Sequence, residues 1–235
     1  MNSPSQTDQP VGPPVDTTPA TRPGPMTLQG RFGRVEKLSV AHAGDLWRAV
    51  EGHDRIWTYM PSYGPFPDEA TFTQWLAGHA ERNDPYAYAI ADASGRAVGI
   101  FTLLAIRPKH RVIEVGHVVY SPALQRTPLA TEAQYLLARY VFETLAYRRY
   151  EWKCDALNAA SRRAAARYGF TFEGIFRQHM IGKGRNRDTA WFAMLDNEWP
   201  ARSPCSTMNG RRAKPRSSAG WRRRISRRTA RRSKA

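Results

Sequence analysis

Apolar residues in the middle of the chain recur with two spacings, which predict strands and helices in turn. Alternation of apolar and polar residues predicts a strand, whereas apolar residues three or four positions apart predict a helix. The expected strands cover 32–38, 86–91, 97–106, 111–120, 149–156, 171–181 and 188–195. The expected helices cover 43–50, 69–79, 128–141 and 159–168. This order predicts an α/β (α+β) single domain, in which helices flank a central mixed sheet.

Residues with strong local preferences mark where several of these elements begin and end. Asp68 is a candidate N-cap for the second helix, and Thr127 followed by Pro128 is a candidate start for the third. Gly169 is expected to close the fourth helix in the left-handed conformation. The last two strands are expected to be joined by residues 182–186, a stretch rich in glycine and polar residues.

Charge is distributed unevenly along the 235 residues. The chain carries 36 Lys and Arg against 20 Asp and Glu, which gives a formal net charge of +16. Residues 201–235 hold 13 of the basic residues and no acidic one, so the rest of the chain has a net charge of +3. This tail is too poor in large apolar residues to fold alone. We therefore expect a disordered Pro-rich segment over 1–25, a folded domain over 26–200 and a disordered tail over 201–235.

Two interpretations of the Arg-rich tail stay open. Lys and Arg neutralise phosphates, so the tail makes a nucleic-acid-binding protein the alternative function for this chain. The second interpretation is that a GC-rich gene is read out of frame beyond residue 200, which gives a similar composition and no selected function.

Cysteine content and hydropathy exclude other classes of protein. Cys154 and Cys205 cannot form a disulfide framework, and neither has the spacing of a zinc site, so we expect no metal and a cytoplasmic location. No apolar run approaches the roughly 20 residues that span a bilayer, so we expect no membrane partner.

One strand-to-helix turn has the composition of a phosphate-binding site. Residues 120–131 run from a predicted strand into a helix N-terminus, where free amides and the helix dipole favour an anion. Asn158, Ser161 and Arg163 follow one strand later, at the start of the next predicted helix.

Together these segments resemble the GNAT superfamily of acyl-CoA-dependent N-acetyltransferases, and within it the RimJ/RimL-like ribosomal-protein group. The resemblance covers about 27–199. It rests on 125–133, 158–163, 168–170, Glu173-Gly174, Gly184-Arg185 with Asp188, and Glu198-Trp199. It implies a central mixed, mostly antiparallel sheet, with acetyl-CoA as co-substrate and a primary amine as acceptor.

The resemblance also implies which residues hold acetyl-CoA. The positions that match the pyrophosphate turn are Gln125, Arg126, Thr127, Leu129, Ala130 and Thr131. The amides of Val118, Val119 and Tyr120 match those that polarise the thioester, Asn158 matches the pantetheine contact, and Arg163 matches a phosphate contact. Pro128 stands where the family usually has glycine, so one amide donor is missing.

For catalysis, the resemblance makes Glu114 the candidate base and assigns Ser161, with Asn158, to the leaving thiolate. The alternative for Glu114 is a strand-face carboxylate paired with Arg111 or Arg149, and His117 competes as base.

Two further alternatives concern the leaving group. The alternative for Asn158 is a helix cap, and the alternative for Ser161 is a solvent-facing side chain. The Tyr that many members use as an acid is replaced by Ala165, and Tyr168 is one residue away from the helix face that a substitute would need.

The acceptor stays open between a protein N-terminus and a small-molecule amine. Residues 57–66 form an aromatic loop at the place where family members build the acceptor pocket, although packing is the alternative role for these side chains. The resemblance also allows a homodimer, since dimers are common in the family.

Overall fold

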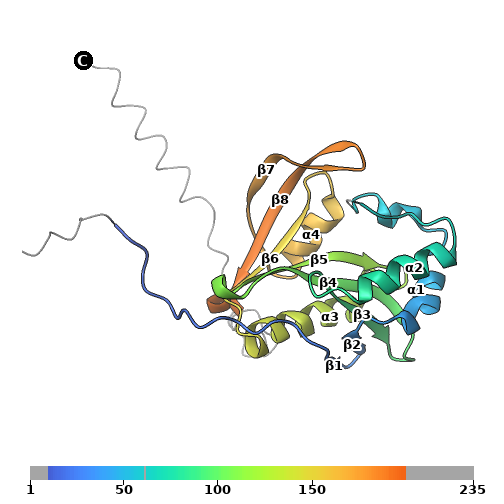
Figure 1. Ribbon diagram of the computed structural model, residues 1–235, viewed down its shortest axis with the longest axis horizontal. Coiled ribbons are helices and arrows are strands. Elements are labelled where there is room, and N and C mark those ends of the chain that lie inside the picture. Colours follow the sequence, from blue (N-terminus) through green and yellow to red (C-terminus); the bar gives the residue numbers. More distant parts are fainter. Residues whose placement is uncertain (1–9, 61, 200–235) are drawn as a thin grey trace, which may run out of the picture. The chain divides into compact units, whose positions relative to one another are not determined.

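One eight-stranded sheet runs through the residues that the computed structural model describes, 10–60 and 62–199 (Figure 1). The strands are β1 Thr27–Gln29, β2 Gly33–Lys37, β3 Tyr86–Asp92, β4 Ala97–Arg107, β5 Val112–Tyr120, β6 Arg149–Asp155, β7 Thr171–Gly182 and β8 Arg185–Leu195. The longer helices are α1 Ala43–Val50, α2 Glu69–Ala80, α3 Pro128–Arg139 and α4 Ala159–Arg167. Short helical segments are η1 Val40–His42, η2 Asp54–Trp57, η3 Pro108–His110, η4 Tyr140–Thr144 and η5 Asp196–Glu198.

The strand order is β1-β2-β3-β4-β5-β6-β8-β7, and every neighbouring pair is antiparallel except β5 and β6. A parallel pair needs a crossover connection, and α3 provides it. The predicted fold, a mixed and mostly antiparallel sheet flanked by helices, is confirmed.

Helices cover the two faces of the sheet separately. The buried face of α3, which includes Ala133 and Leu137, packs with Val115 and Trp152 in one core. On the other face, α1 and α2 pack in a second core that includes Phe72. The larger core lies beneath β5 and β6, so it supports the centre of the sheet.

Local capping signals in the sequence mark the starts of α2 and α3 and the end of α4 as predicted. The Asp68 carboxylate accepts from the amide of Thr71 at 2.7 Å, at the start of α2. Thr127 and Pro128 begin α3, and Gly169 adopts a φ of 97° after α4.

Two details of the sheet differ from the prediction. β1 is absent from the predicted elements, because three residues are too few for a periodic pattern. The connection between β7 and β8 is shorter than predicted, since only Lys183 and Gly184 separate the two strands. Both residues have positive φ, 50° and 72°, which is typical of a tight two-residue hairpin.

Contacts with the domain begin before residue 26, where the sequence places its start. The amide of Ala20 donates to the carbonyl of Pro108 at 3.1 Å, and the amide of Thr21 donates to Leu145 at 2.9 Å. The prolines of this segment prevent regular structure but leave the other amides free to bond to the domain. The predictions for residues 1–9 and 201–235 lie outside the described residues, and no helix of the described part is long and apolar enough to cross a membrane.

Candidate active site

The centre of the sheet opens between β5 and β6. Their parallel pairing ends at Val115 and Trp152, although both strands run on and β5 reaches Tyr120. Backbone groups on this side of 116–120 have no partner on β6, which leaves them available to a ligand. The predicted thioester contacts lie in this unpaired segment: Val118, Val119 and Tyr120.

A bulge in β5 accounts for the divergence. Between the register pairs Thr102–Gly116 and Ile100–Val119, β5 contains one residue more than β4. His117 lies in the bulge with a φ of 49°. An extra residue bends a strand and increases its twist, so β5 turns away from β6 at this point.

The turn from β5 into α3 brings the predicted pyrophosphate contacts together. Thr127 Oγ1 accepts from the amide of Ala130 at 3.1 Å, which fixes the helix start. Gln125 Nε2 donates to the carbonyl of Tyr120 at 2.9 Å, and Arg126 is exposed with a φ of 64°. The turn and first helical residues contain all six positions: Gln125, Arg126, Thr127, Leu129, Ala130 and Thr131.

Arg167 of α4 adds a cation to this turn that the sequence reasoning missed. Its Nη1 donates to Thr131 Oγ1 at 2.8 Å. The predicted phosphate contact, Arg163, is exposed one turn earlier on the same helix. Their spacing of four residues places both on one helix face, and this is the signal that would have found Arg167. Pro128 opens α3 without an N–H, and Arg167 brings a cationic donor from α4 to this helix start in addition to Arg126 of the turn.

Asn158 and Ser161 are held at the start of α4. The Asn158 side chain accepts from the amide of Ser161 at 3.0 Å, so it is the helix cap. Ser161 Oγ accepts from Trp152 Nε1 at 3.0 Å and is half-buried. The alternative of a solvent-facing serine is therefore wrong, because Trp152 of β6 fixes the hydroxyl beside the gap.

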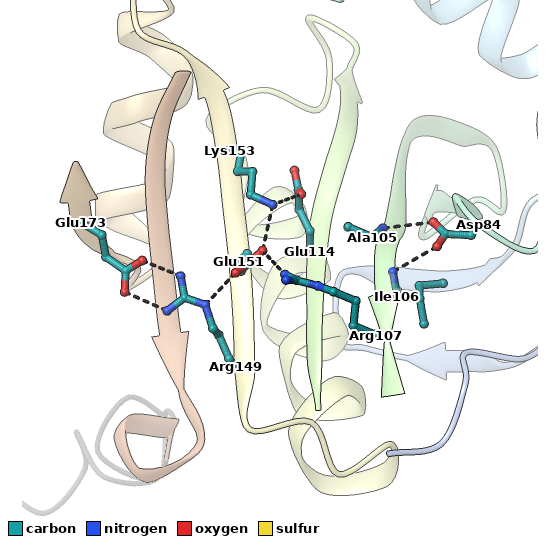
Figure 2. A network of polar contacts seen from close by, with 9 residues as sticks. All are labelled: Asp84, Ala105, Ile106, Arg107, Glu114, Arg149, Glu151, Lys153 and Glu173. Carbon is teal, nitrogen blue, oxygen red and sulfur yellow. Dashed lines mark hydrogen bonds and ion pairs between the residues drawn. The ribbon is translucent and has the colours of Figure 1, made fainter. Parts of the chain in front are cut away.

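Glu114 pairs with Lys153 of the neighbouring strand. Lys153 Nζ lies 2.7 Å from Glu114 Oε2 and 2.8 Å from Glu151 Oε2 (Figure 2). The alternative that Glu114 pairs with Arg111 or Arg149 is wrong. Glu114 and Glu151 are register neighbours in the parallel pair, and Lys153 follows two residues later on the same face.

Glu151 is the centre of this charge network. It accepts from Arg149 Nε at 2.7 Å and from Arg107 Nη2 at 3.0 Å, and Arg149 Nη1 reaches Glu173 at 2.8 Å (Figure 2). Burial opposes ionisation of Glu151, but hydrogen bonds from Arg149 and Lys153 hold its pKa below the ordinary value. Glu151 is therefore a charged anchor that holds Lys153 in place.

The second oxygen of Glu114 faces the open part of β5. A Cβ added to Gly116 would lie 3.5 Å from Glu114 Oε1, so this oxygen points along the strand toward the bulge. Burial raises the pKa of Glu114, and the charge of Lys153 opposes that rise. A buried carboxylate with a raised pKa is suited to proton transfer near neutral pH.

His117 belongs to a cluster of buried rings beside the gap. Its ring centroid lies 5.6 Å from that of Tyr63 and 5.6 Å from that of His79. Burial lowers the pKa of each histidine to about 4, so both are neutral at physiological pH. His117 Nδ1, His79 Nε2 and the Tyr63 hydroxyl are buried without a partner among the described residues.

Two side chains, Lys183 and Tyr59, link the aromatic loop to segments beside the gap. Lys183, at the tip of the β7–β8 hairpin, donates to the carbonyls of Gly64 at 2.6 Å and Trp57 at 3.0 Å. The hydroxyl of Tyr59 donates to Leu157 after β6 at 3.3 Å. The side chains of the predicted aromatic loop thus pack against one another. The loop also contacts the β7–β8 hairpin and the residues that follow β6.

Comparison with known proteins assigns the fold and chemistry to a family. Residues 34–171 match the acetyltransferase (GNAT) domain. The chain belongs to the GNAT acetyltransferase family. A GCN5-related N-acetyltransferase from Brucella melitensis is 46% identical, with a TM-score of 0.76 over 78% of this chain and 85% of its own.

Two other relatives support the assignment. A "probable acetyltransferases (GNAT family)" structure from Chromobacterium violaceum ATCC 12472 is 42% identical, with a TM-score of 0.76 over 84% of this chain and 100% of its own. The "Putative ribosomal N-acetyltransferase YdaF" of Bacillus subtilis (strain 168) is 26% identical over 139 residues, which are 59% of this chain and 74% of that protein.

The GNAT site has the features that acetyl-CoA requires. GNAT enzymes use acetyl-CoA as co-substrate, which needs donors for a thioester oxygen and cations for phosphates. The segment of β5 beyond its pairing with β6 contains backbone amides, and the α3 turn with Arg167 contains cations, which are groups of these two kinds. In the described ranges, no group of three or more His, Cys, Asp and Glu side chains is placed to hold a metal ion.

The GNAT domain lacks a tyrosine at one position where a leaving-group acid is often found. Ala165 occupies it and is fully buried. The Tyr168 ring packs against Trp152 and under the Arg167 guanidinium, and Gln134 Nε2 donates to the Tyr120 hydroxyl at 2.9 Å. Tyr168 is thus engaged on the α3 and α4 face of the sheet, which leaves Ser161 as the hydroxyl fixed at the start of the gap.

Proposed function

We propose that this GNAT acetyltransferase transfers the acetyl group of acetyl-CoA directly to a primary amine, with Glu114 as the base. The observation that carries the proposal is the arrangement of Glu114, whose Oε2 is fixed by Lys153 while Oε1 faces the unpaired part of β5. Acetyl-CoA supplies the activated acetyl group when bound, and all proton handling falls to residues of this chain.

Residues on the two sides of the gap take different parts in the proposed reaction. Glu114 takes a proton from the incoming ammonium, which frees the nitrogen lone pair to form the new C–N bond. Amides within Val118–Tyr120 polarise the thioester oxygen as the C–S bond breaks. The Ser161 hydroxyl, held by Trp152, stabilises the thiolate that leaves, and the thiolate takes the second proton that the new amide nitrogen loses. Asn158 orients the pantetheine arm beside it.

Direct transfer, without an acetylated enzyme, fits the state of the available cysteine. Cys154 is buried in the core beneath β6, and burial raises the pKa of its thiol. A buried thiol with a raised pKa is a poor nucleophile, because the thiolate is the reactive form. We therefore assign no covalent role to Cys154.

We propose a protein N-terminus ahead of a small-molecule amine as acceptor, and a RimJ/RimL-like activity in the cytoplasm. The Bacillus relative named as a ribosomal N-acetyltransferase supports this order. The open sheet edge of β7, which is exposed along most of its length, leaves room for a chain larger than a metabolite.

Calorimetric titration with acetyl-CoA and a thiol-release assay on a panel of peptides and amines test the proposal. We expect acetyl-CoA to bind the wild type and Glu114→Gln alike, whereas Glu114→Gln loses about 100-fold or more in kcat/KM. Glu51→Gln, which neutralises an exposed carboxylate after α1, is the matched control. Absence of acetyl-CoA binding refutes the proposed function, and equal activity of Glu114→Gln and the control refutes the base.

The nucleic-acid alternative is tested in the same preparation. Binding of RNA or DNA by the full chain that disappears on removal of 201–235 supports it, and its strength should fall steeply with salt. Those residues lie outside the described part of the chain, so the alternative rests on their charge alone.

A further inference from the structure

Strand β8 carries two buried hydrogen-bond donors that have no acceptor. Arg187 Nε and Trp191 Nε1 are both buried without a partner among the described residues. They lie four residues apart on one strand, so they project from the same face of the sheet. A buried donor without an acceptor is costly, and two on one face indicate a ligand that supplies the acceptors.

These donors border the proposed base. Lys153 Nζ lies 4.1 Å above the ring of Trp191 and also pairs with Glu114. Arg187 lies on the same face of β8 as Trp191, and its charge acts on both Glu114 and His117. Both donors therefore adjoin the place where the acceptor amine meets Glu114.

The unpaired charge on this face is positive. No carboxylate of the described residues forms an ion pair with Arg187, although Asp188 follows it directly. The Asp188 carboxylate accepts from the Gln178 amide at 2.7 Å, and Glu114 and Glu151 share Lys153. Arg and Trp only donate, and the planar guanidinium matches a carboxylate. A polyamine would bring more positive charge to a face that lacks a free acid.

We propose that Arg187 binds a carboxylate of the acceptor, while Trp191 donates to a carbonyl oxygen nearer the amine. The acceptor class is then a peptide whose N-terminal amine is followed closely by an acidic side chain. This inference rests on the proposed function and narrows its acceptor.

Steady-state acetylation of matched peptides by the full chain tests the inference. One C-terminally amidated tetrapeptide has aspartate at its second position, and its partner has asparagine, so the two differ in one carboxylate. We expect the wild type to favour the aspartate peptide by about 10- to 100-fold in kcat/KM, mainly through KM, since a hydrogen bond to a charged group is worth that factor. Spermidine should be the poorest substrate.

Variants separate recognition from structure. Arg187→Gln should abolish the preference for the aspartate peptide, which is a ratio of two efficiencies of the same variant and so does not depend on its absolute rate. Arg177→Gln removes the same charge from the exposed part of the same hairpin and should keep the preference. Trp191→Phe keeps a ring against Phe176 but loses the donor, and should raise KM for both peptides.

Three results would overturn the inference: equal efficiency with both peptides, a preference that survives Arg187→Gln, or better turnover of spermidine. If acetyl-CoA binds and neither peptide is acetylated, the inference also fails while acetyl transfer to another amine stands. If acetyl-CoA does not bind, the failure belongs to the proposed function.

Discussion

Replacing Lys153 by methionine should move the acid side of the pH–rate profile upward. Lys153 Nζ lies 2.7 Å from Glu114 Oε2, and a charge pair at this distance is worth about 6 kcal/mol at an effective dielectric constant of 20. Relaxation of the site and the remaining charge of Arg187 reduce the net effect, but the pKa of Glu114 should still rise, because the charge of Lys153 no longer favours the carboxylate. Glu151 keeps Arg107 and Arg149 as partners, so the rest of the network survives.

The direction in which the pH–rate profile shifts follows from the role of Glu114 as base. A base acts when it is deprotonated, so activity falls as pH drops through its pKa, and a higher pKa moves that fall to higher pH. The measurement is kcat/KM for the amine against pH at saturating acetyl-CoA, for the wild type and Lys153→Met. The double variant Lys153→Met with Glu114→Gln should lose this limb altogether. An acid limb that stays in place in Lys153→Met would show that another group titrates.

Further outcomes follow from the site and from the packing. Ser161→Ala should lower kcat by about 100-fold with an unchanged acetyl-CoA Kd, measured by thiol release and calorimetry. Glu151→Gln should lower the free energy of unfolding in urea by about 3–5 kcal/mol at pH 7, because three cations lose their buried partner. Since the folded pKa of Glu151 lies below its ordinary value, this difference should shrink as pH falls through the acid range. Gly33→Ala places a Cβ 2.2 Å from the carbonyl oxygen of Ala91 and should cost about 3 kcal/mol, whereas Gly78→Ala, inside α2 with no atom within 4 Å, should stabilise by about 1 kcal/mol in the same assay. A loss of stability in Gly78→Ala as large as in Gly33→Ala would contradict the packing argument.

Features that depend on neighbouring residues were predictable from the sequence. The N-caps Asp68 and Thr127 and the left-handed Gly169 act within one helical turn, so their residue types are sufficient evidence. The two-residue turn at Lys183 and Gly184 was missed because a lysine with positive φ has no distinctive sequence signal.

Features that depend on strand register were not predictable. Lys153 becomes the partner of Glu114 only because β5 and β6 are parallel and in a particular register. The contact of Arg167 with Thr131 likewise joins two helices that are far apart in the sequence. Gly116 directly precedes the bulge at His117, and an isolated glycine inside a strand pattern was the one signal of it in the residues, while the resemblance placed the cofactor there.

The short parallel pairing of β5 with β6 also bears on how the protein assembles. β1 to β5 pair in sequence order by antiparallel neighbours, and such local contacts form quickly. β6, β7 and β8 form a second antiparallel group, which joins the first across four register pairs. The candidate active site lies at this junction of β5 and β6. We therefore expect a nascent chain that ends at Tyr120 to contain only half of the catalytic groups. It should be inactive until β6, β7 and β8 have joined the sheet.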